Sequence, residues 1–231
     1  KTWGIPVLTE KLVSHAPSGI LLTGDAASLA KMCESTKVLI TTVGPYALYG
    51  EELLEACVRA DTSYCDITGE PAFVSKSIEQ HHEAAKARGI RIVHCCGFDS
   101  IPADLGTFYT LKKLKGDGIK VHGYVTAHGE FSGGTWASAL NAMADSKANF
   151  RLVPKGGLKR GPQMPGFHRA NTVKGGWGLP MPVIDPAIVR RSAYVRGDYP
   201  QGFSYKQYLR MGSAMKAATL TASIGAVVMG A

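Results

Sequence analysis

Short apolar runs alternate with longer segments of helical periodicity through the first half of the chain. The apolar runs predict strands at residues 20–24, 37–43, 63–68 and 90–94. The segments between them predict helices at residues 26–34, 51–60 and 71–88. Because the connections are short, we expect parallel strands joined by right-handed crossovers, with helices on both faces. The pattern therefore predicts an α/β fold built on a doubly wound parallel sheet.

The pattern changes after about residue 115. Residues 119–128 alternate like an exposed strand, residues 131–145 predict a Gly-rich loop that enters a helix, and residues 154–183 are dense in Gly, Pro and Lys. A chain of 231 residues that is 45% hydrophobic has room for one good-sized core and a smaller second region. We therefore expect a parallel-sheet domain at residues 1–118, an α+β region at 119–210 and an apolar segment at 211–231.

The net charge of +8 belongs to the last third of the chain. Residues 151–231 carry 12 Lys and Arg against only Asp185 and Asp198. Such a surface suits nucleic acid, anionic lipid or an acidic partner, and it equally suits plain solvation. The basic, Gly-rich stretches lack the interleaved aromatic residues that stack on bases, so we expect no nucleic-acid partner.

The cysteine pattern predicts a reducing, intracellular environment. The five cysteines are odd in number, show no CxxC spacing and mostly lie in apolar patterns, so a disulfide framework is not expected. The chain has no N-x-S/T sequon and no signal-peptide pattern. Since it begins with Lys1 and ends inside an apolar run, we expect it to be a piece of a longer protein.

The end of the chain is apolar and uncharged over residues 217–231, but this segment is shorter than the ~20 residues that span a bilayer. Ala222, Ala226 and Gly230 recur at the four-residue spacing of close helix contacts in membranes. A buried or interfacial amphipathic helix explains the same residues. We favour association with a membrane surface, mitochondrial, lipid-droplet or endomembrane, or with a membrane protein complex.

Polar and conformationally special residues follow every predicted strand. Gly24 and Asp25 follow the first strand, "GPYALYG" (44–50) the second, "GEP" (69–71) the third and "CCGFDSIPADLG" (95–106) the fourth. The carboxyl ends of parallel strands meet at one edge of a sheet, where ligands bind. The sequence therefore predicts a ligand site at this edge.

Several of these residues have both a chemical and a purely structural interpretation. The hydroxyl of Tyr46 or Tyr49 would stabilise an oxyanion or donate a proton, or its ring would pack on the sheet edge. Glu70 would cap a helix or bind a cofactor ribose, or only complement the N-terminus of the helix that follows Pro71. Gly97 would let the backbone approach a ligand, and Asp99 or Ser100 would cap the next helix.

Other chemistries fit less well. His94, Cys95 and Cys96 are neighbours on a strand, so their side chains alternate between faces, and we expect no metal site. The chain contains no GxSxG nucleophile elbow and no GxxxxGK[ST] phosphate loop.

Three motifs in one order resemble a known family. They are "TTVGPYALYGEELLEAC" (41–57), "YCDITGE" (64–70) and "CGFDSIPADLG" (96–106), and "SGGTWAS" (132–138) is a fourth match. They resemble the saccharopine dehydrogenase-like oxidoreductases, in particular the branch with trans-acting enoyl reductases and membrane-associated animal proteins. The resemblance covers about residues 20–145 well.

The resemblance implies a Rossmann-type domain that binds NAD or NADP, and an inserted α+β domain used for substrate contact or for a homodimer. Matching positions assign Asp25 to the adenine end of the cofactor. The remaining cofactor-binding candidates are Val43, Gly44, Pro45, Gly69, Glu70, Gly97, Phe98 and Asp99, the last three at the nicotinamide. The catalytic candidates are Tyr46, Asp99 and Ser100, and Glu70 and Asp104 are further residues on the substrate side.

One departure from the family concerns the phosphates of the cofactor. The family begins with a strand and a Gly-rich turn, and nothing before residue 20 fits G-x-G-x-x-G, so this piece alone is expected to bind a dinucleotide poorly.

The sequence and the resemblance leave two candidate functions. The first is an NAD(P)-dependent oxidoreductase that reduces a C=C or C=N bond of a lipid-like or amino-acid-like small molecule. The second is a catalytically inactive accessory subunit of a membrane protein complex.

Overall fold

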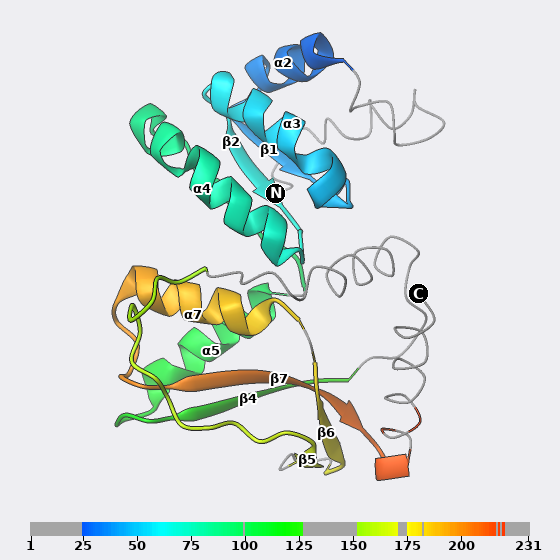
Figure 1. Cartoon of the computed structure of the whole chain (residues 1–231), viewed down its shortest axis with the longest axis vertical. Coiled ribbons are helices and arrows are strands. Elements are labelled where there is room, and N and C mark those ends of the chain that lie inside the picture. The colour runs from blue at the N-terminus through cyan, green and yellow to red at the C-terminus, as the bar shows by residue number, and fades with distance from the viewer. Residues whose placement is uncertain are drawn as a thin grey trace, which may run out of the picture. The chain divides into compact units, whose positions relative to one another are not determined.

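A computed structural model describes residues 25–98, 100–126, 152–170, 175–181, 183–215, 217 and 219 (Figure 1). The helices are α2 (Ala26–Glu34), α3 (Tyr46–Arg59), α4 (Pro71–Arg88), α5 (Ile101–Lys113) and α7 (Asp185–Arg196). The strands are β1 (Val38–Thr41), β2 (Ser63–Asp66), β3 (Ile92–Val93), β4 (Lys120–Val125), β5 (His168–Arg169), β6 (Trp177–Pro180) and β7 (Ser204–Met211). The described chain forms two compact units, and the boundary falls after Phe98.

The first unit is built on a parallel sheet with strand order β1-β2-β3. Leu39 pairs with Tyr64, and Tyr64 pairs in turn with Ile92. The α/β class, with its Rossmann-type parallel sheet, is therefore confirmed. Parallel crossovers are almost always right-handed, so strands added in one direction carry their connecting helices on one face.

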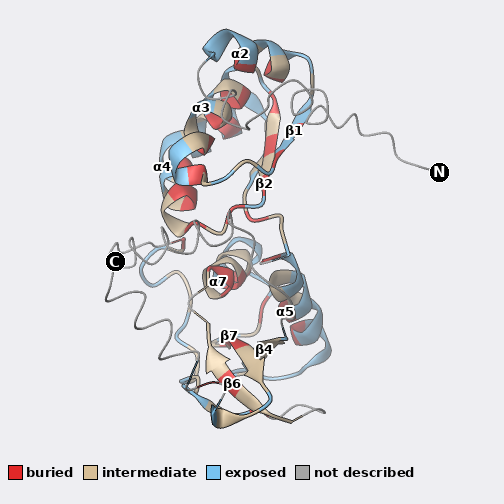
Figure 2. Cartoon of the chain, turned by 90° about the vertical axis from the view of Figure 1, so that its right-hand side faces the viewer, coloured by how far each residue is buried: buried red, intermediate tan, exposed pale blue. Residues whose placement is uncertain are grey.

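The burial pattern of the first sheet agrees with that topology. Leu39 and Tyr64 point into a core shared with α2, α3 and α4, whereas Val38 and Ile40 alternate with them and are about half exposed. Figure 2 shows buried and exposed positions side by side around α3 and α4. We expected helices on both faces, and the part of this unit that the structure describes places its helices on one.

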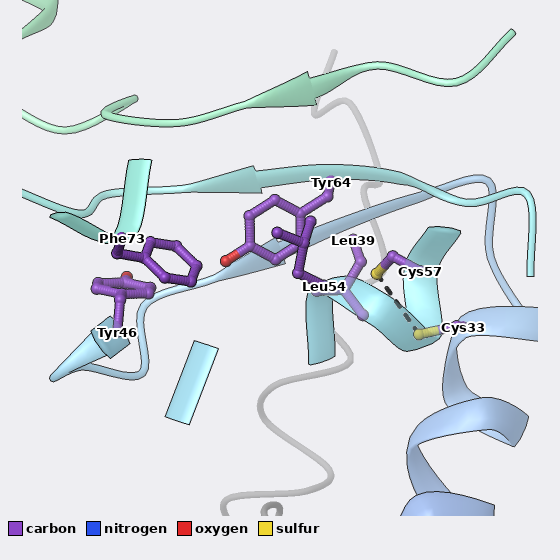
Figure 3. Close-up of a cluster of buried hydrophobic side chains, with 7 residues drawn as sticks. All are labelled: Cys33, Leu39, Tyr46, Leu54, Cys57, Tyr64 and Phe73. Atoms are coloured by element: carbon purple, nitrogen blue, oxygen red, sulfur yellow. Dashed lines mark hydrogen bonds between the residues drawn. The ribbon is translucent and has the colours of Figure 1, made fainter. Parts of the chain in front are cut away.

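The core of the first unit gathers seven buried side chains (Figure 3), which are Cys33, Leu39, Tyr46, Leu54, Cys57, Tyr64 and Phe73. Burying an apolar side chain of the size of leucine contributes about 1.5–3 kcal/mol. The sulfur atoms of Cys33 and Cys57 lie 3.5 Å apart, and all five cysteines are free thiols. The core thus holds α2 against α3 by packing and not by a disulfide.

Helix boundaries follow the predictions at α2 and α4 but not at α3. Helix α4 begins at Pro71 and ends before Gly89, whose φ of 67° is left-handed as predicted for a helix stop. Helix α3 was predicted to begin at residue 51, but it begins at Tyr46. The supposed loop 44–50 is therefore largely the first turn of a helix.

The second unit is an α+β structure. Its sheet has the order β4-β7-β6-β5, with β4 and β7 parallel and the other pairs antiparallel. Helices α5 and α7 pack over a core that includes Leu111, Val189 and Tyr205. The expected region 1–118 contained α5, and in the structure α5 packs on α7 in this second unit.

A segment that approaches β7 supports the second sheet. The hydroxyl of Ser204 donates to the carbonyl of Pro162 (2.7 Å), and the hydroxyl of Tyr208 donates to the carbonyl of Pro165 (2.8 Å). Most of the predicted apolar segment, residues 217–231, lies outside the described residues. Among the residues that are described, no helix is long and apolar enough to cross a bilayer.

Candidate functional site

The carboxyl ends of β1, β2 and β3 lie at one edge of the first sheet, because the three strands are parallel. Residues 42–45, 67–70 and 94–98 leave the sheet at this edge, which we call the rim. The rim therefore contains most of the predicted cofactor-binding residues. Asp99 lies outside the described residues.

Asp25 belongs to the start of α2. Its carboxylate accepts a hydrogen bond from the amide of Ala27 (3.1 Å) and another from the hydroxyl of Ser28. The bond from Ser28 is the main cause that lowers the pKa of Asp25. Asp25 is thus a helix cap with an exposed carboxylate. Its predicted position at the adenine end of a cofactor stays a prediction.

Glu70 holds the start of α3. Its two carboxylate oxygens accept hydrogen bonds from the amides of Tyr46 (3.0 Å) and Ala47 (2.8 Å), and the residue is only 3% exposed. The Glu70 amide donates to the hydroxyl of Thr68 (3.1 Å). A negative charge at a helix N-terminus is stabilised by the unpaired amides there. Glu70 therefore fits the helix-end interpretation, although the helix is α3 and not α4.

Tyr46 is buried between the ends of two strands. Its hydroxyl donates to the carbonyl of Thr41 (3.1 Å) and accepts from the amide of Ile67 (3.4 Å). Burial is the main cause that raises the pKa of this hydroxyl above its usual value. These contacts make Tyr46 a bridge within the rim. Its predicted catalytic role has no support from them.

Asp66 ties together the loops that follow β2 and β3. It is fully buried, and one carboxylate oxygen accepts from the amides of Thr68 (3.1 Å) and Cys95 (3.0 Å). The backbone carbonyl of Asp66 accepts from the amide of Cys96 (2.7 Å). Asp66 was not among the predicted site residues. Its position as the last residue of a strand at the rim was the signal available in the sequence.

His94 connects Asp66 to helix α4. Its Nδ1 lies 2.6 Å from a carboxylate oxygen of Asp66, and its Nε2 lies 2.7 Å from the hydroxyl of Ser77. A Ser-His-Asp arrangement of this kind activates the serine in hydrolases. Here Ser77 is 1% exposed and Asp66 is fully buried, so the serine has no surface from which to attack a substrate. The arrangement is structural.

The exposed residues of the rim are Thr42, Gly44, Ile67 and Phe98. Gly44 is exposed, Val43 and Pro45 are half-buried, and the peptide bond between Gly44 and Pro45 is cis. Phe98 is 75% exposed. A Cβ on Gly97 would lie 3.1 Å from the Cβ of Ile67, so glycine suits the close approach of these two loops. The rim thus offers mostly apolar surface to a ligand, and its one carboxylate, that of Glu70, is buried.

Ser100 and Asp104 belong to the second unit. Ser100 precedes α5, and its buried hydroxyl has no hydrogen-bond partner among the described residues. The carboxylate of Asp104 accepts from the hydroxyl of Ser192 on α7 (2.7 Å). Burial is the main cause that raises the pKa of Asp104. Asp104 therefore joins two helices, and the predicted substrate-side roles of both residues stay predictions.

The described residues suit the nicotinamide ring of a dinucleotide better than its pyrophosphate. Gly44 is exposed at the rim, Gly69 and Gly97 are half-buried there, and the ring of Phe98, next to Gly97 in the chain, is exposed, which suits a flat ring. The first amides of α3 already bind Glu70, so they are not offered to a pyrophosphate. Within the described ranges, no three His, Cys, Asp or Glu residues lie close enough to hold a metal ion.

Relatives of the chain were found by sequence comparison, whereas no protein-family model matches it. A Mycobacterium tuberculosis protein whose name is that of a trans-acting enoyl reductase is 34% identical over 98% of this chain. The human saccharopine dehydrogenase-like oxidoreductase is 35% identical over 72% of it. A Caenorhabditis elegans protein named lipid droplet localized protein is 32% identical over 80% of it.

The chain is shorter than these relatives. It spans 61% of the mycobacterial protein, 41% of the human protein and 47% of the nematode protein. The relatives nevertheless match 72–98% of this chain, which is more than the residues 20–145 that the resemblance covers well. This chain belongs to the saccharopine dehydrogenase-like oxidoreductase family, together with the relatives named trans-acting enoyl reductases.

Proposed function

We propose that the full-length protein is an NAD(P)-dependent oxidoreductase whose cofactor lies against the rim. The observation that carries the proposal is the rim surface formed by Gly44 and Phe98, which are exposed, and Gly97, which is half-buried. Buried hydrogen bonds such as that from the Cys95 amide to Asp66 hold this surface in place. The names of the relatives, oxidoreductase and enoyl reductase, support the same reaction class. They favour a C=C bond next to a carbonyl as the bond that is reduced, with C=N reduction as the alternative.

The residues of this chain would bind and orient the reactants. When bound, the nicotinamide supplies a hydride to the substrate. Val43, Gly44 and Pro45 would line the cofactor, and Phe98 would stack beside it and exclude water. Asp99, which follows Phe98 in the chain, is the proposed donor of the proton that completes the reduction. Ser100 stays a predicted catalytic residue, because its hydroxyl is buried in the second unit. In this proposal Tyr46 positions the rim through its bonds to Thr41 and Ile67.

Fluorescence titration of the full-length protein with NADPH and NADH tests the proposal. We expect saturable binding, and we expect Phe98→Ala to weaken it about three- to tenfold because one aromatic stacking contact is lost. Tyr109→Ala is the matched control, because Tyr109 is a similarly exposed aromatic residue (67%) on α5 of the second unit. No binding of either nucleotide would refute the proposal and favour the inactive accessory subunit.

We further propose that the second unit binds an anionic lipid surface. Phe167, 46% exposed, stacks on Trp177 with ring centroids 5.0 Å apart. Arg169 and Met211 are the cross-strand neighbours of Trp177. Aromatic side chains beside basic ones are typical of residues that insert at a membrane interface. The basic last third of the chain and the name of the nematode relative support this partner.

Vesicle co-sedimentation tests the lipid proposal. We expect binding to phosphatidylcholine vesicles that contain phosphatidylserine, weaker binding at high salt, and loss of binding in Phe167→Ala. Tyr194→Ala on α7, where the residue is 41% exposed, serves as the control. Equal loss in both variants, or binding that ignores phosphatidylserine, would contradict the proposal. Light scattering that finds a dimer at high salt, and a monomer in Phe167→Ala, would favour the homodimer instead.

A further inference from the structure

Three buried side chains join the rim to helix α4. Asp66, His94 and Ser77 are fully buried or nearly so, and each hydrogen bond between them is 2.6–2.7 Å long. A carboxylate offers only acceptors, so Nδ1 of His94 donates to Asp66. In a neutral ring Nε2 is then an acceptor, and the hydroxyl of Ser77 donates to it.

The rings around His94 restrict its orientation. Phe73 and Tyr64 both meet the imidazole edge-on, at centroid distances of 5.3 and 5.8 Å. Asp66 and Ser77 bind the two ring nitrogens, so these hydrogen bonds and the two neighbouring rings together fix the orientation of the imidazole. A histidine fixed in this way also fixes the carboxylate that it binds.

The loop that leaves β3 depends on that carboxylate. The amide of Cys95 donates to a side-chain oxygen of Asp66, and the amide of Cys96 donates to its backbone carbonyl. Cys95 has a φ of 61°, in the left-handed region that residues with a Cβ rarely adopt. The bonds to Asp66 hold the loop in this conformation, and Gly97 and Phe98 follow directly.

We propose that Ser77, His94 and Asp66 form a positioning relay that sets the conformation of residues 95–98. The inference rests on the proposed function in one respect, namely that this loop borders the nicotinamide. An apolar side chain at position 94 would fill the same space. It would not hold the acceptor of the Cys95 amide in place. The relay therefore acts on the cofactor through the loop, and none of its members touches the substrate.

Amide hydrogen exchange of the full-length protein tests the relay without using activity. Ser77→Ala removes one buried donor, and we expect exchange of residues 95–98 to accelerate about tenfold. Asp66→Asn keeps the Oδ1 acceptor and donates to the other tautomer of His94, so exchange should stay close to that of wild type. Asp66→Ala has no such rescue, and we expect faster exchange than in Ser77→Ala.

Thr62→Val is the matched control. Thr62 is also fully buried, and its hydroxyl donates to the carbonyl of Cys33 (2.7 Å) at the other end of β2. We expect this variant to lose stability without selective acceleration of residues 95–98. The relay would be overturned if residues 95–98 exchanged at the wild-type rate in Ser77→Ala and Asp66→Ala. It would also be overturned if Thr62→Val accelerated their exchange equally.

NADPH titration of the same variants separates the two proposals. If the relay positions the loop for the cofactor, Ser77→Ala raises the NADPH dissociation constant about tenfold, and Asp66→Asn leaves it close to that of wild type. Unchanged binding despite a loosened loop would refute the link to the cofactor. If the wild-type protein binds no NADPH, the proposed function fails, whereas the exchange data still decide whether the relay sets the loop.

Discussion

Replacing Glu70 tests whether a side chain from the start of α4 holds the start of α3. Glu70→Ala removes both carboxylate oxygens from the amides of Tyr46 and Ala47. Tyr46 is buried, so its amide is left without a partner, whereas Ala47 is exposed enough for water to replace the lost bond. The variant should therefore open α3 from its first turn.

The magnitude follows from these two contacts. A hydrogen bond to a charged group contributes about 1.5–3 kcal/mol, and a charge at a helix N-terminus contributes up to about 2 kcal/mol. The two descriptions overlap, and water compensates at Ala47, so we expect a loss of about 2–4 kcal/mol for Glu70→Ala. Glu70→Gln keeps one acceptor and should lose about half as much.

Amide hydrogen exchange of α3 measures this loss as a change in the free energy of opening. Glu55→Gln is the control within the same helix, because the Glu55 carboxylate pairs with Arg59 at the surface and loss of that pair should cost under about 0.5 kcal/mol. The reasoning would be refuted if Glu70→Ala destabilised α3 no more than Glu55→Gln. Equal destabilisation of α7, in the second unit, would also refute it.

Three further predictions concern packing and pH. Gly50→Ala places a Cβ 2.7 Å from the ring of Phe73 and should destabilise the first unit by about 1–3 kcal/mol in urea, with partial rescue by Phe73→Leu; no loss would contradict this. The raised pKa of Asp104 means that the folded state binds its proton more tightly, so stability of the second unit should fall as pH rises from 3.8 through the folded pKa. Asp104→Asn, whose amide oxygen can still accept from Ser192, should abolish this fall. Urea midpoints that change with pH in the same way in wild type and variant would contradict the prediction. Burial is the main cause that lowers the pKa of His122, so NMR should find it titrating below 6.5 and stability should decline as pH falls through 6.5; a midpoint at or above 6.5 would exclude this.

The order of elements in the first unit was determined by the sequence alone. Apolar runs of five to seven residues alternate with amphipathic segments, and short connections between such elements allow little besides parallel strands. Pro71 and Gly89 mark the ends of α4 because their backbone preferences are local. The location of the rim follows from the same pattern, since parallel strands all end at one edge.

The role of each rim residue was decided by the tertiary structure. Glu70 and the α3 amides are more than 20 residues apart in sequence, as are Asp66 and His94, and each pair meets only because β1, β2 and β3 are in parallel register. Tyr46 was predicted on a loop because the carboxylate that supports its helix lies in a different segment. Local preferences determine where an element begins and ends, but which carboxylate meets an amide instead of water depends on which chain segments the fold brings together.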